Sequence, residues 1–388
     1  MSLSICLLTR NAEQNLGRVL SSVAGMKAEV IVADTASTDG TIAAAQSHGA
    51  RVILLDWQDD FGAAQNQVLA QASGEWILWL NPDEELLPQG REHLGALLSR
   101  PDALAYVVRV QEVMNREEPN RATETLNLRL FRRHPDVRFI GRLHPTFAVP
   151  LEEVARRQNK HILQADLLVR HHAYLSVLTP DKLRWVTRLL ELELRDRPGQ
   201  LHYLIDYGRN NLLLNDPRGH ALLAEAAELV LAVQDAPQAP TATVASLLEY
   251  LLTVSPEQSR SRLAFDKARE LVLRWFPSSP PLLWQLAQAA FRAEDFRDAA
   301  GLLEKLIHLG RTKTYNRASA FDPSIMAEPA VLNLGMCYLR LGELDWAETC
   351  FGQVLGSPSH QARARQGYAM VQALRQRGKE EPAMVGRQ

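Results

Sequence analysis

Short apolar runs alternate with amphipathic segments over the first 80 residues, and this alternation restricts the fold of the chain more than any other feature. Strands that alternate with helices along a chain form parallel βαβ units. The sequence therefore predicts an α/β domain with a largely parallel sheet. The predicted strands and helices are, in chain order, Leu3 to Leu8, Asn15 to Val23, Val30 to Ala33, Thr41 to His48, Val52 to Leu55, Phe61 to Ala72 and Trp76 to Leu80.

Polar side chains follow three of the predicted strands, at Asp34, Asp56 and Asn81. Right-handed crossovers bring the carboxyl ends of parallel strands to one edge of the sheet, and ligands of open α/β sheets bind outside that edge. The segment that begins at Asp34 also opens a helix. We therefore expect Asp34 to face a ligand while Asp39 holds the helix amino terminus; an ordinary helix cap by a hydroxyl of this segment is the alternative.

The fourth predicted strand leads directly into the sequence Asn81-Pro82-Asp83-Glu84-Glu85. Carboxylates at this edge suit a metal ion that binds phosphate, because hard cations prefer oxygen ligands. Taken alone, the same residues also form a turn in which Pro82 fixes the bend. We expect Glu84 and Glu85 to supply first-turn charge to a helix that begins near Pro88.

Beyond the first hundred residues the pattern changes twice. Between about Ala103 and Val169 hydrophobic and polar residues alternate, which predicts the strands of a mixed sheet that covers the first half. Beyond Pro180 the pattern is helical almost to the end, with proline and glycine confined to boundaries. We place the change of domain between Leu175 and Pro198 and predict domains at 1–178 and 179–388.

The helical half contains a repeat. Its last unit has small and aromatic residues at the spacing of a tetratricopeptide unit, in which Gly and Ala permit close helix crossing and aromatic rings fill the gaps. A looser unit begins at Trp284, Tyr207-Gly208 marks a degenerate copy, and we expect the insertion from Arg311 to Glu328 to project as a loop. A solenoid is predicted, with a generic helical bundle as the alternative. The residues of the last unit are Leu334, Gly335, Tyr338, Gly342, Ala347, Phe351 and Pro358.

Composition excludes several classes of protein. With 388 residues, 46% hydrophobic and 23% charged, the chain is a globular protein large enough for two or three domains. A formal net charge of -2 gives no basic excess for nucleic acid, and no run of about 18 apolar residues predicts a membrane span. Cys6, Cys337 and Cys350 have apolar neighbours and are too scattered for a disulfide framework, so we expect buried thiols in a reducing, cytoplasmic compartment.

Four segments of the first half together resemble a family-two glycosyltransferase of GT-A fold. They are Ile5 to Asn11 with Glu13 and Asn15, Val30 to Thr41, Asp59 to Asn66, and Gly74 to Glu85. Later segments resemble a bacterial subgroup that carries tetratricopeptide repeats after the catalytic domain; they are Phe131-Arg132, Phe139 to His144 and His171 to Tyr174. The resemblance implies an α/β GT-A domain, Rossmann-like with a mixed sheet, followed by an all-α solenoid like that of tetratricopeptide repeats.

The resemblance also implies sugar transfer from a nucleotide-diphosphate-sugar, with a divalent cation, Mn or Mg, between the diphosphate and the acidic motif. The cation neutralises charge on the leaving diphosphate while a side-chain base removes the proton of the acceptor. Asp83 matches the second, metal-binding acid, and His171 matches a late histidine that completes the coordination. The residues expected to bind the donor are Thr9, Asn11, Asp34, Ser37, Asp39, Asp60, Gln65, Asn66 and Asn81.

Three positions depart from the family pattern. Asn81 stands where the first aspartate is usual, which weakens the negative field around a cation. Gln65 stands where arginine is usual, which removes a partner for carboxylate or phosphate. Pro145 replaces a glutamate that commonly follows the histidine and is a candidate general base. His144 or His172 can take its place, because neutral imidazole titrates near working pH.

Two hypotheses follow from these matches and departures. The first is an inverting glycosyltransferase whose repeats present a protein, peptide or other acceptor. The second is a catalytically impaired glycosyltransferase-like protein that uses its repeats as a binding or scaffold module. In either case the repeats can also mediate assembly into a homo-oligomer. Four arginines are expected either to line a diphosphate pocket or to mark the solvent face of a sheet: Arg132, Arg133, Arg138 and Arg142.

Overall fold

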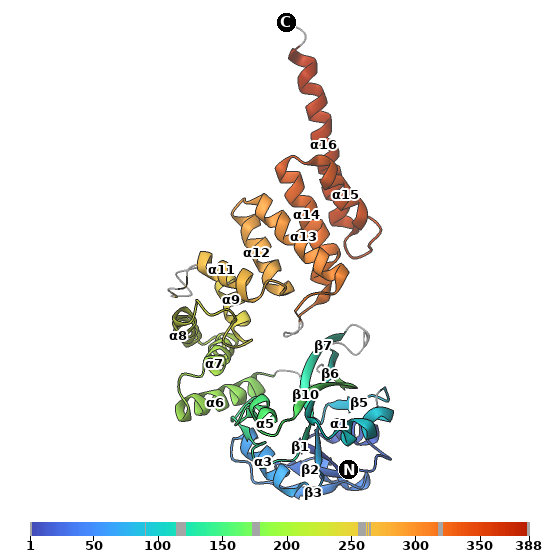
Figure 1. Cartoon of the computed structure of the whole chain (residues 1–388). Helices are drawn as coiled ribbons and strands as arrows, with labels where there is room; N and C mark the ends of the chain where they lie inside the picture. Colours follow the sequence, from blue (N-terminus) through green and yellow to red (C-terminus); the bar gives the residue numbers. More distant parts are fainter. Residues whose placement is uncertain are drawn as a thin grey trace. The chain divides into compact units, whose positions relative to one another are not determined.

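The computed structural model describes residues 2–89, 91–113, 122–172, 179–254, 261, 263, 265–316 and 321–385. It divides into two compact units, Met1–Tyr203 and Leu204–Gln388 (Figure 1). Helix α6 (Pro180–Asp196) lies in the first unit, whereas the sequence prediction begins the second domain at residue 179. Contacts of α6 with the loop at Arg142 explain the difference, because Glu193 accepts a hydrogen bond from Arg142 N at 2.7 Å.

An eight-stranded mixed sheet forms the core layer of the first unit, with the strand order β3-β2-β1-β4-β7-β6-β10-β5. Strands β1 to β4 are parallel, as the alternating sequence predicts. β7 is antiparallel to β4 and β10 is parallel to β6, so the later strands extend the first sheet rather than cover it. The strands are β1 (Leu3–Thr9), β2 (Glu29–Asp34), β3 (Arg51–Leu54), β4 (Trp76–Trp79), β5 (Glu84–Leu86), β6 (Ala103–Val113), β7 (Ala122–Arg132) and β10 (His161–His171), with β8 (Phe139–Ile140) and β9 (Thr146–Phe147) in a separate two-stranded sheet.

Helices cover both faces of this sheet, because successive strand residues point to opposite sides. Trp76 and Leu78 of β4 share one core with α1, α2 and α4. Ile77 and Trp79 share the other core with α3 and α5. A continuous apolar run such as β4 is typical of a strand that is covered on both faces. The helices are α1 (Glu13–Ser22), α2 (Thr41–Ser47), α3 (Phe61–Gln71), α4 (Leu94–Ser99) and α5 (Leu151–Arg157).

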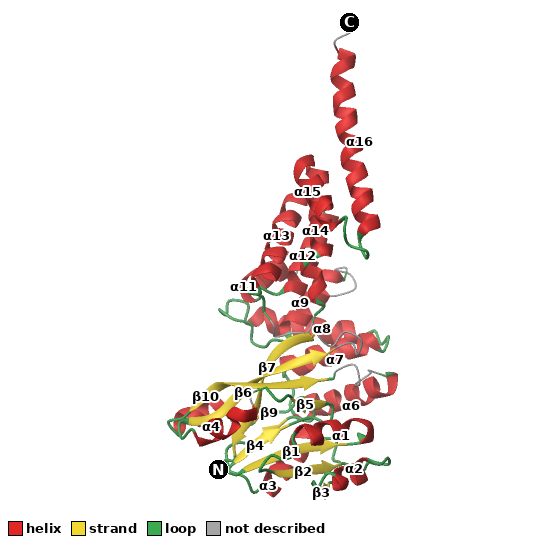
Figure 2. Cartoon of the chain, turned by 90° about the vertical axis from the view of Figure 1, so that its right-hand side faces the viewer, coloured by secondary structure: helices red, strands yellow, loops and turns green. Residues whose placement is uncertain are grey.

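The second unit is all-α in its described residues (Figure 2). This confirms the predicted change from an α/β region to a helical one. Helix α7 (Leu201–Leu213) begins three residues before the boundary between the units. The following helices are α8 (Arg218–Ala232), α9 (Val244–Thr253), α11 (Phe265–Trp275), α12 (Pro280–Arg292), α13 (Phe296–Thr312), α14 (Glu328–Leu341), α15 (Leu344–Val354) and α16 (Gln361–Val385).

Glycine permits the close packing of the last helices. α14, α15 and α16 pack in sequence order around Phe351, which is 1% exposed. A Cβ atom at Gly335 would lie 2.8 Å from Cε1 of Phe351, and one at Gly367 would lie 2.4 Å from the same atom. Larger side chains would therefore force the helices apart. The predicted roles of Gly335 and Phe351 in close helix crossing are confirmed.

The insertion from Arg311 to Glu328 does not project as a loop in its described part, so that prediction is wrong. α13 continues to Thr312, and the short 3-10 helix η3 (Pro323–Met326) packs against α12, α13 and α14. Met326 is 7% exposed, because its side chain fills the space above Gly310. Residues 317–320 lie outside the described residues.

The three cysteines are buried thiols, as predicted. Burial raises the pKa of Cys6 and of Cys337 to about 12 and that of Cys350 to about 11. Each side chain therefore stays protonated at neutral pH and acts as a small apolar group. Among the helices described above, none has both the length and the apolar character needed to cross a bilayer.

Candidate active site

A buried carboxylate holds the loop after β2 against the end of β1. Asp34 is 0% exposed. It accepts hydrogen bonds from Ser37 N at 2.8 Å, from Ser37 Oγ at 2.5 Å and from Thr9 Oγ1 at 3.2 Å. Asp34 therefore supports this loop, and its predicted role in binding a donor stays a prediction. It is covered because β1 and β2 stay paired up to Thr9 and Asp34.

Asn11 and Asp39 order the exposed part of the same edge. Asn11 Oδ1 accepts from Thr38 N at 2.8 Å, and Asn11 N donates to Ser37 Oγ at 2.7 Å. Asp39 accepts from the hydroxyl of Thr41 at 2.5 Å and from its amide at 3.0 Å, at the start of α2. These bonds hold the pKa of Asp39 below its usual value. The predicted role of Asp39 at the helix amino terminus is confirmed.

Two residues in these loops have a left-handed backbone conformation that is uncommon outside glycine. The φ angle is 49° at Asn11 and 62° at Ala36. Such a conformation costs roughly 1–3 kcal/mol and persists only where surrounding bonds impose it, which occurs most often at ligand sites. Both residues closely follow the ends of β1 and β2, so the loops at this edge of the sheet have a constrained backbone.

The segment from Asn81 to Glu84 is a turn in which the first and last residues are joined by hydrogen bonds. Glu84 N donates to Asn81 O at 3.1 Å, while Asn81 N and Nδ2 donate to the Glu84 carboxylate at 2.8 and 3.1 Å. The Glu84 side chain is 1% exposed and lies 2.5 Å from an Arg129 guanidinium nitrogen. Glu84 and Glu85 belong to β5, so their predicted first-turn role is wrong. A three-residue strand is too short for periodicity to reveal.

Glu84 is the site residue that sequence reasoning missed. Burial raises its pKa above the usual value, and the positive charge of Arg129 opposes that rise. Arg129 Nε is itself buried and has no hydrogen-bond partner in the described part of the chain. The spacing Asn81-x-x-Glu84 was the available signal, because a glutamate three residues after the start of a turn can reach back to its first amide, as in a capping box.

Asp83 and His171 meet at the sheet edge. Asp83 Oδ2 lies 3.3 Å from His171 Nε2, and Glu112 Oε2 lies 2.5 Å from His171 Nδ1. Both predicted metal ligands are therefore adjacent. The sheet creates this arrangement, because β10 places His171 opposite Glu84 of β5 and opposite Glu112 of β6.

Asp83 and His171 can bind a divalent cation if a further ligand, such as a diphosphate, completes its coordination. Within the described ranges, no group of three or more His, Cys, Asp and Glu side chains forms a closed metal site. Asp83 and His171 supply one oxygen and one nitrogen, a set that suits manganese better than magnesium. Glu112 on Nδ1 is the outer carboxylate that typically orients a metal-binding imidazole. Burial lowers the pKa of His171, but hydrogen bonds to Asp83 and Glu112 outweigh it and raise the pKa to about 10.

His172 lies behind the pair and faces a second glutamate. Glu85 is 3.4 Å from His172 Nε2 and 3.3 Å from a guanidinium nitrogen of Arg170. Burial lowers the pKa of His172, and the charge of Arg18 lowers it further. Its 9% exposure leaves little room for an acceptor to reach the imidazole. Residues 173–178, which include the rest of the late motif, lie outside the described residues.

The predicted donor-binding residues at α3 have different surroundings. Asp60 caps the helix by accepting from Ala63 N at 2.8 Å. Asn66 exchanges two hydrogen bonds of 2.8 Å with the backbone of Phe139 and so holds β8. Gln65 Oε1 is buried and has no hydrogen-bond partner among the described residues. Gln65 thus has an open acceptor, and the donor-binding roles of all three residues stay predictions.

His144 lies in the loop between β8 and β9, where it is exposed and has a φ angle of 46°. Its neighbours anchor the loop, since Tyr203 Oη donates to Leu143 O at 2.6 Å and Gly62 N donates to Gly141 O at 3.0 Å. These bonds fix the backbone of the loop on either side of His144. A catalytic role for His144 stays a prediction.

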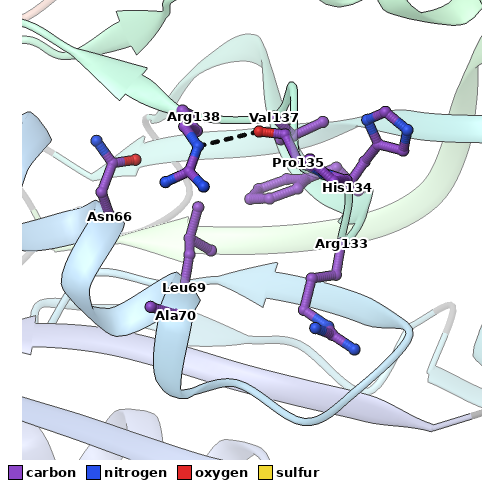
Figure 3. A pocket seen from close by; sticks show the side chains of 9 residues that line it. Asn66, Leu69, Ala70, Arg133, His134, Pro135, Val137 and Arg138 are labelled. Carbon is purple, nitrogen blue, oxygen red and sulfur yellow. Dashed lines mark hydrogen bonds between the residues drawn. The ribbon is translucent and has the colours of Figure 1, made fainter.

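The four arginines do not line a diphosphate pocket beside Asp83. Because β7 runs antiparallel to β4, Arg132 lies opposite Trp76, at the amino end of β4. Arg133 and Arg138 line a cavity of about 300 Å³ beside the last turns of α3 (Figure 3). Arg142 binds α6 instead. These arginines therefore do not gather beside Asp83, and neither alternative for them is tested.

Comparisons with known proteins assign the first unit to a family. The family model Glycosyl transferase family 2 matches residues 4–154. A TPR repeat-containing protein of Synechococcus elongatus is 36% identical over 173 residues, which are 44% of this chain and 42% of that protein. An uncharacterized glycosyltransferase of Rickettsia typhi is 30% identical over 128 residues, which are 32% of this chain and 44% of that protein. The chain spans less than half the length of each of these two relatives.

Among solved structures, S. aureus TarS 1-349 in complex with UDP-GlcNAc is similar at 16% sequence identity and a TM-score of 0.39. The alignment covers 70% of this chain and 90% of that one. The family match spans β1 to β4 and the loops that carry Asn11, Asp39 and Asp83. The amino-terminal region of this chain therefore contains a glycosyl transferase family 2 domain over residues 4–154, and the second unit is all-helical in its described residues.

Proposed function

We propose that the chain is an inverting, metal-dependent glycosyltransferase that moves a sugar from a nucleotide-diphosphate-sugar to a protein, peptide or other acceptor. The observation that carries this proposal is the meeting of Asp83, His171 and Glu112 at the carboxyl edge of the sheet. An acid and an imidazole, with a second carboxylate behind the imidazole, form half of a cation site that a diphosphate completes.

In this proposal the residues at the edge have separate tasks. Asp83 and His171 hold the cation, Mn or Mg, which when bound supplies positive charge to the leaving diphosphate. Glu112 keeps the imidazole oriented through Nδ1. Asn81 presents a neutral amide beside the pair, so the charge that attracts the cation comes mainly from Asp83.

The nucleoside binds along the loops after β1 and β2. At the exposed side of these loops Asn11 bonds to Ser37 and Thr38, and Asp39 accepts from Glu13 N. Asp34 is buried beneath these loops and supports them, because its two oxygens accept hydrogen bonds from Ser37. Gln65 Oε1 is buried and accepts no hydrogen bond from the described residues. In this proposal a ribose hydroxyl or a base N–H of the nucleotide donates to it.

The helical unit offers a place for a peptide acceptor. A cavity of about 440 Å³ lies between α12, α14 and α16, with an apolar wall that includes Trp284 and Met336. Asn333 and Arg363 add polar groups to it, and such groups can pair with a peptide backbone or carboxylate. Selection from a random heptapeptide display library on the full chain is expected to enrich a motif whose binding Asn333→Ala reduces without loss of nucleotide binding.

One observation favours the alternative of a catalytically impaired, scaffold-like protein. His172 is 9% exposed and its Nε2 lies 3.4 Å from Glu85, so its position does not favour a base that meets an acceptor at the edge. Binding of a nucleotide sugar without hydrolysis or transfer supports this alternative. Slow hydrolysis that is lost in Asp83→Ala supports the enzyme. The cytoplasmic location and self-association stay predictions in both cases.

The donor site is tested by thermal unfolding with manganese and the diphosphates of uridine, guanosine and thymidine. One of these is expected to raise the melting temperature, because a ligand present at 100 times its Kd stabilises the native state by about 2.7 kcal/mol. Asp83→Ala should remove the manganese-dependent part of the shift. Asp136→Ala is the matched control, since this exposed aspartate follows β7 at the other end of β4. No shift with any of the three diphosphates would contradict the donor site.

A further inference from the structure

We propose that Glu84 and Arg129 are positioning residues that select an amide over a carboxylate at position 81 and thereby hold the turn that carries Asp83. This inference rests on the proposed function, because the turn matters for activity only if a metal–diphosphate complex binds there. Its evidence is the pair of hydrogen bonds from Asn81 N and Nδ2 to Glu84, together with the Arg129 contact of 2.5 Å.

The three side chains form a charge-matched set. Glu84 carries one negative charge, Arg129 carries one positive charge, and Asn81 is neutral. The set is mostly shielded from water, since the side chains of Glu84 and Arg129 are 1% and 19% exposed. An uncompensated charge in such a place is costly because little water can solvate it. The neutral side chain at position 81 therefore keeps the net charge of these three side chains at zero.

An aspartate at position 81 would break this balance. Its oxygen would occupy the place of Asn81 Nδ2, which now donates to Glu84 Oε1 at 3.1 Å. Two carboxylate oxygens at that separation repel each other unless one takes up a proton. The structure therefore gives a physical reason for the amide at 81, and it places the negative charge of the turn on Glu84.

The set acts on the metal site through the backbone. Asp83 is the third residue of the turn that Asn81 and Glu84 close. On its other side, His172 N donates to Asp83 O at 2.9 Å. Loss of the contact between Asn81 and Glu84 removes one support of Asp83 and leaves the hydrogen bond from His172 N in place. The alignment of Asp83 with His171 Nε2 would then weaken, and the protein supplies only these two predicted ligands.

A second Arg–Glu pair also involves β7 and provides a matched control. Glu75, just before β4, pairs with Arg132 of β7. Glu75 is 44% exposed, and Arg132 is held independently by Ala103 O at 2.8 Å and Arg100 O at 2.9 Å. Loss of Glu75 therefore removes an ion pair of β7 without changing the turn at Asn81.

The test is a reciprocal exchange in the full chain. Wild type, Asn81→Asp, Glu84→Gln and the double variant are compared by electron paramagnetic resonance of Mn²⁺ with the diphosphate that stabilises wild type most. Each single variant should raise the apparent Kd for Mn²⁺ about tenfold. The double variant keeps the neutral sum, but it does not reproduce every hydrogen bond, because Glu84 Oε1 accepts from both Asn81 Nδ2 and Arg129. Its Kd should therefore fall between that of the weaker single variant and that of wild type, and that of Glu75→Gln should stay within about twofold.

The outcomes separate this inference from the proposed function. If wild type binds Mn²⁺ and a diphosphate but Asn81→Asp binds as tightly, or the double variant is no better than the weaker single variant, the positioning role is overturned. If wild type binds none of the diphosphates, the proposed function fails. In that case the melting temperatures of the four ligand-free proteins test the contact between positions 81 and 84. A higher melting temperature in the double variant than in the single variants supports this contact, and additive losses overturn it.

Discussion

Two glutamates of the first unit are almost completely buried, yet their surroundings differ. Glu193 of α6 is 0% exposed and accepts from Arg142 N at 2.7 Å, from Arg197 at 2.5 Å and from Gln200 Nε2 at 2.8 Å. Glu84 of β5 is 1% exposed, and its side chain accepts from one arginine and from the residue three positions earlier. One carboxylate is held by three separate residues, and the other by two.

The opposite pKa directions of the two glutamates express this difference. Burial alone would raise the pKa of Glu193, but the bonds from Arg142, Arg197 and Gln200 outweigh it and lower the pKa. At Glu84 burial prevails and the pKa is raised. A carboxylate with many donors stabilises the fold, whereas a buried carboxylate with few donors costs stability and is retained mainly where a site requires it. The comparison thus separates a buried glutamate that has enough donors from one that has too few.

Loss of the arginine partner should cost more at Glu84 than at Glu193. Arg129→Met removes the arginine partner of Glu84 and is expected to lower the free energy of unfolding by about 3–5 kcal/mol. Arg197→Met leaves Glu193 with two other donors and should cost only about 0.5–1.5 kcal/mol. Urea unfolding of both variants measures the difference. Equal losses would show that the number of remaining donors does not matter.

Acid should weaken the contribution of Glu193. Its pKa is lower in the folded chain than its ordinary value of 4.5, so the folded state binds fewer protons than the unfolded state near that pH. The stabilisation is therefore complete above that ordinary value and is lost as the pH falls through the folded pKa. Each tenfold difference in proton affinity between the two states corresponds to about 1.4 kcal/mol. Glu193→Gln should lack this acid dependence when both proteins are unfolded in urea across the acid range. Parallel curves would contradict the assignment.

A smaller change tests the loop that Glu193 helps to hold. Tyr203→Phe removes the hydroxyl that donates to Leu143 O and should cost about 0.5–1.5 kcal/mol. If His144 is catalytic, the same change should lower kcat while the Mn²⁺ affinity stays as in wild type. An unchanged kcat, with the stability loss present, would argue against a role for this loop in turnover.

The smallest effect is expected at the exposed Arg–Glu pair. Glu75→Gln should lower the free energy of unfolding by no more than about 1 kcal/mol, because exposed ion pairs are solvated and Arg132 keeps its other contacts. Differential scanning calorimetry alongside Arg129→Met gives the comparison. A loss as large as that of Arg129→Met would mean that exposure does not distinguish the two pairs.

Much of the first unit follows from local pattern. The strands β1 to β4 and the helices between them occur where the apolar runs and amphipathic segments predict them. The approach of Asp83 to His171 was predicted only through resemblance to a family, because 88 residues separate them in the sequence. Nothing local to either residue specifies that β10 ends beside β5.

The failures of sequence reasoning share a physical cause. Glu84 was expected at a helix start but lies in β5, and local pattern did not reveal that Glu84 and Asp34 are both buried. Local pattern records which residues are polar, but it does not record which polar residues are covered. Covering depends on pairing with distant strands, such as the contact of Glu84 with Arg129 of β7.

The sequence by itself determined the parallel strands, the change to helices and the edge at which polar residues gather, because hydrophobic periodicity and strand-end composition are local properties. Only the tertiary structure decided which carboxylates are covered and support the loops and which lie at the open edge. That choice depends on burial and on donors brought from elsewhere in the chain, since a carboxylate removed from water is stable only where other segments replace its lost hydrogen bonds.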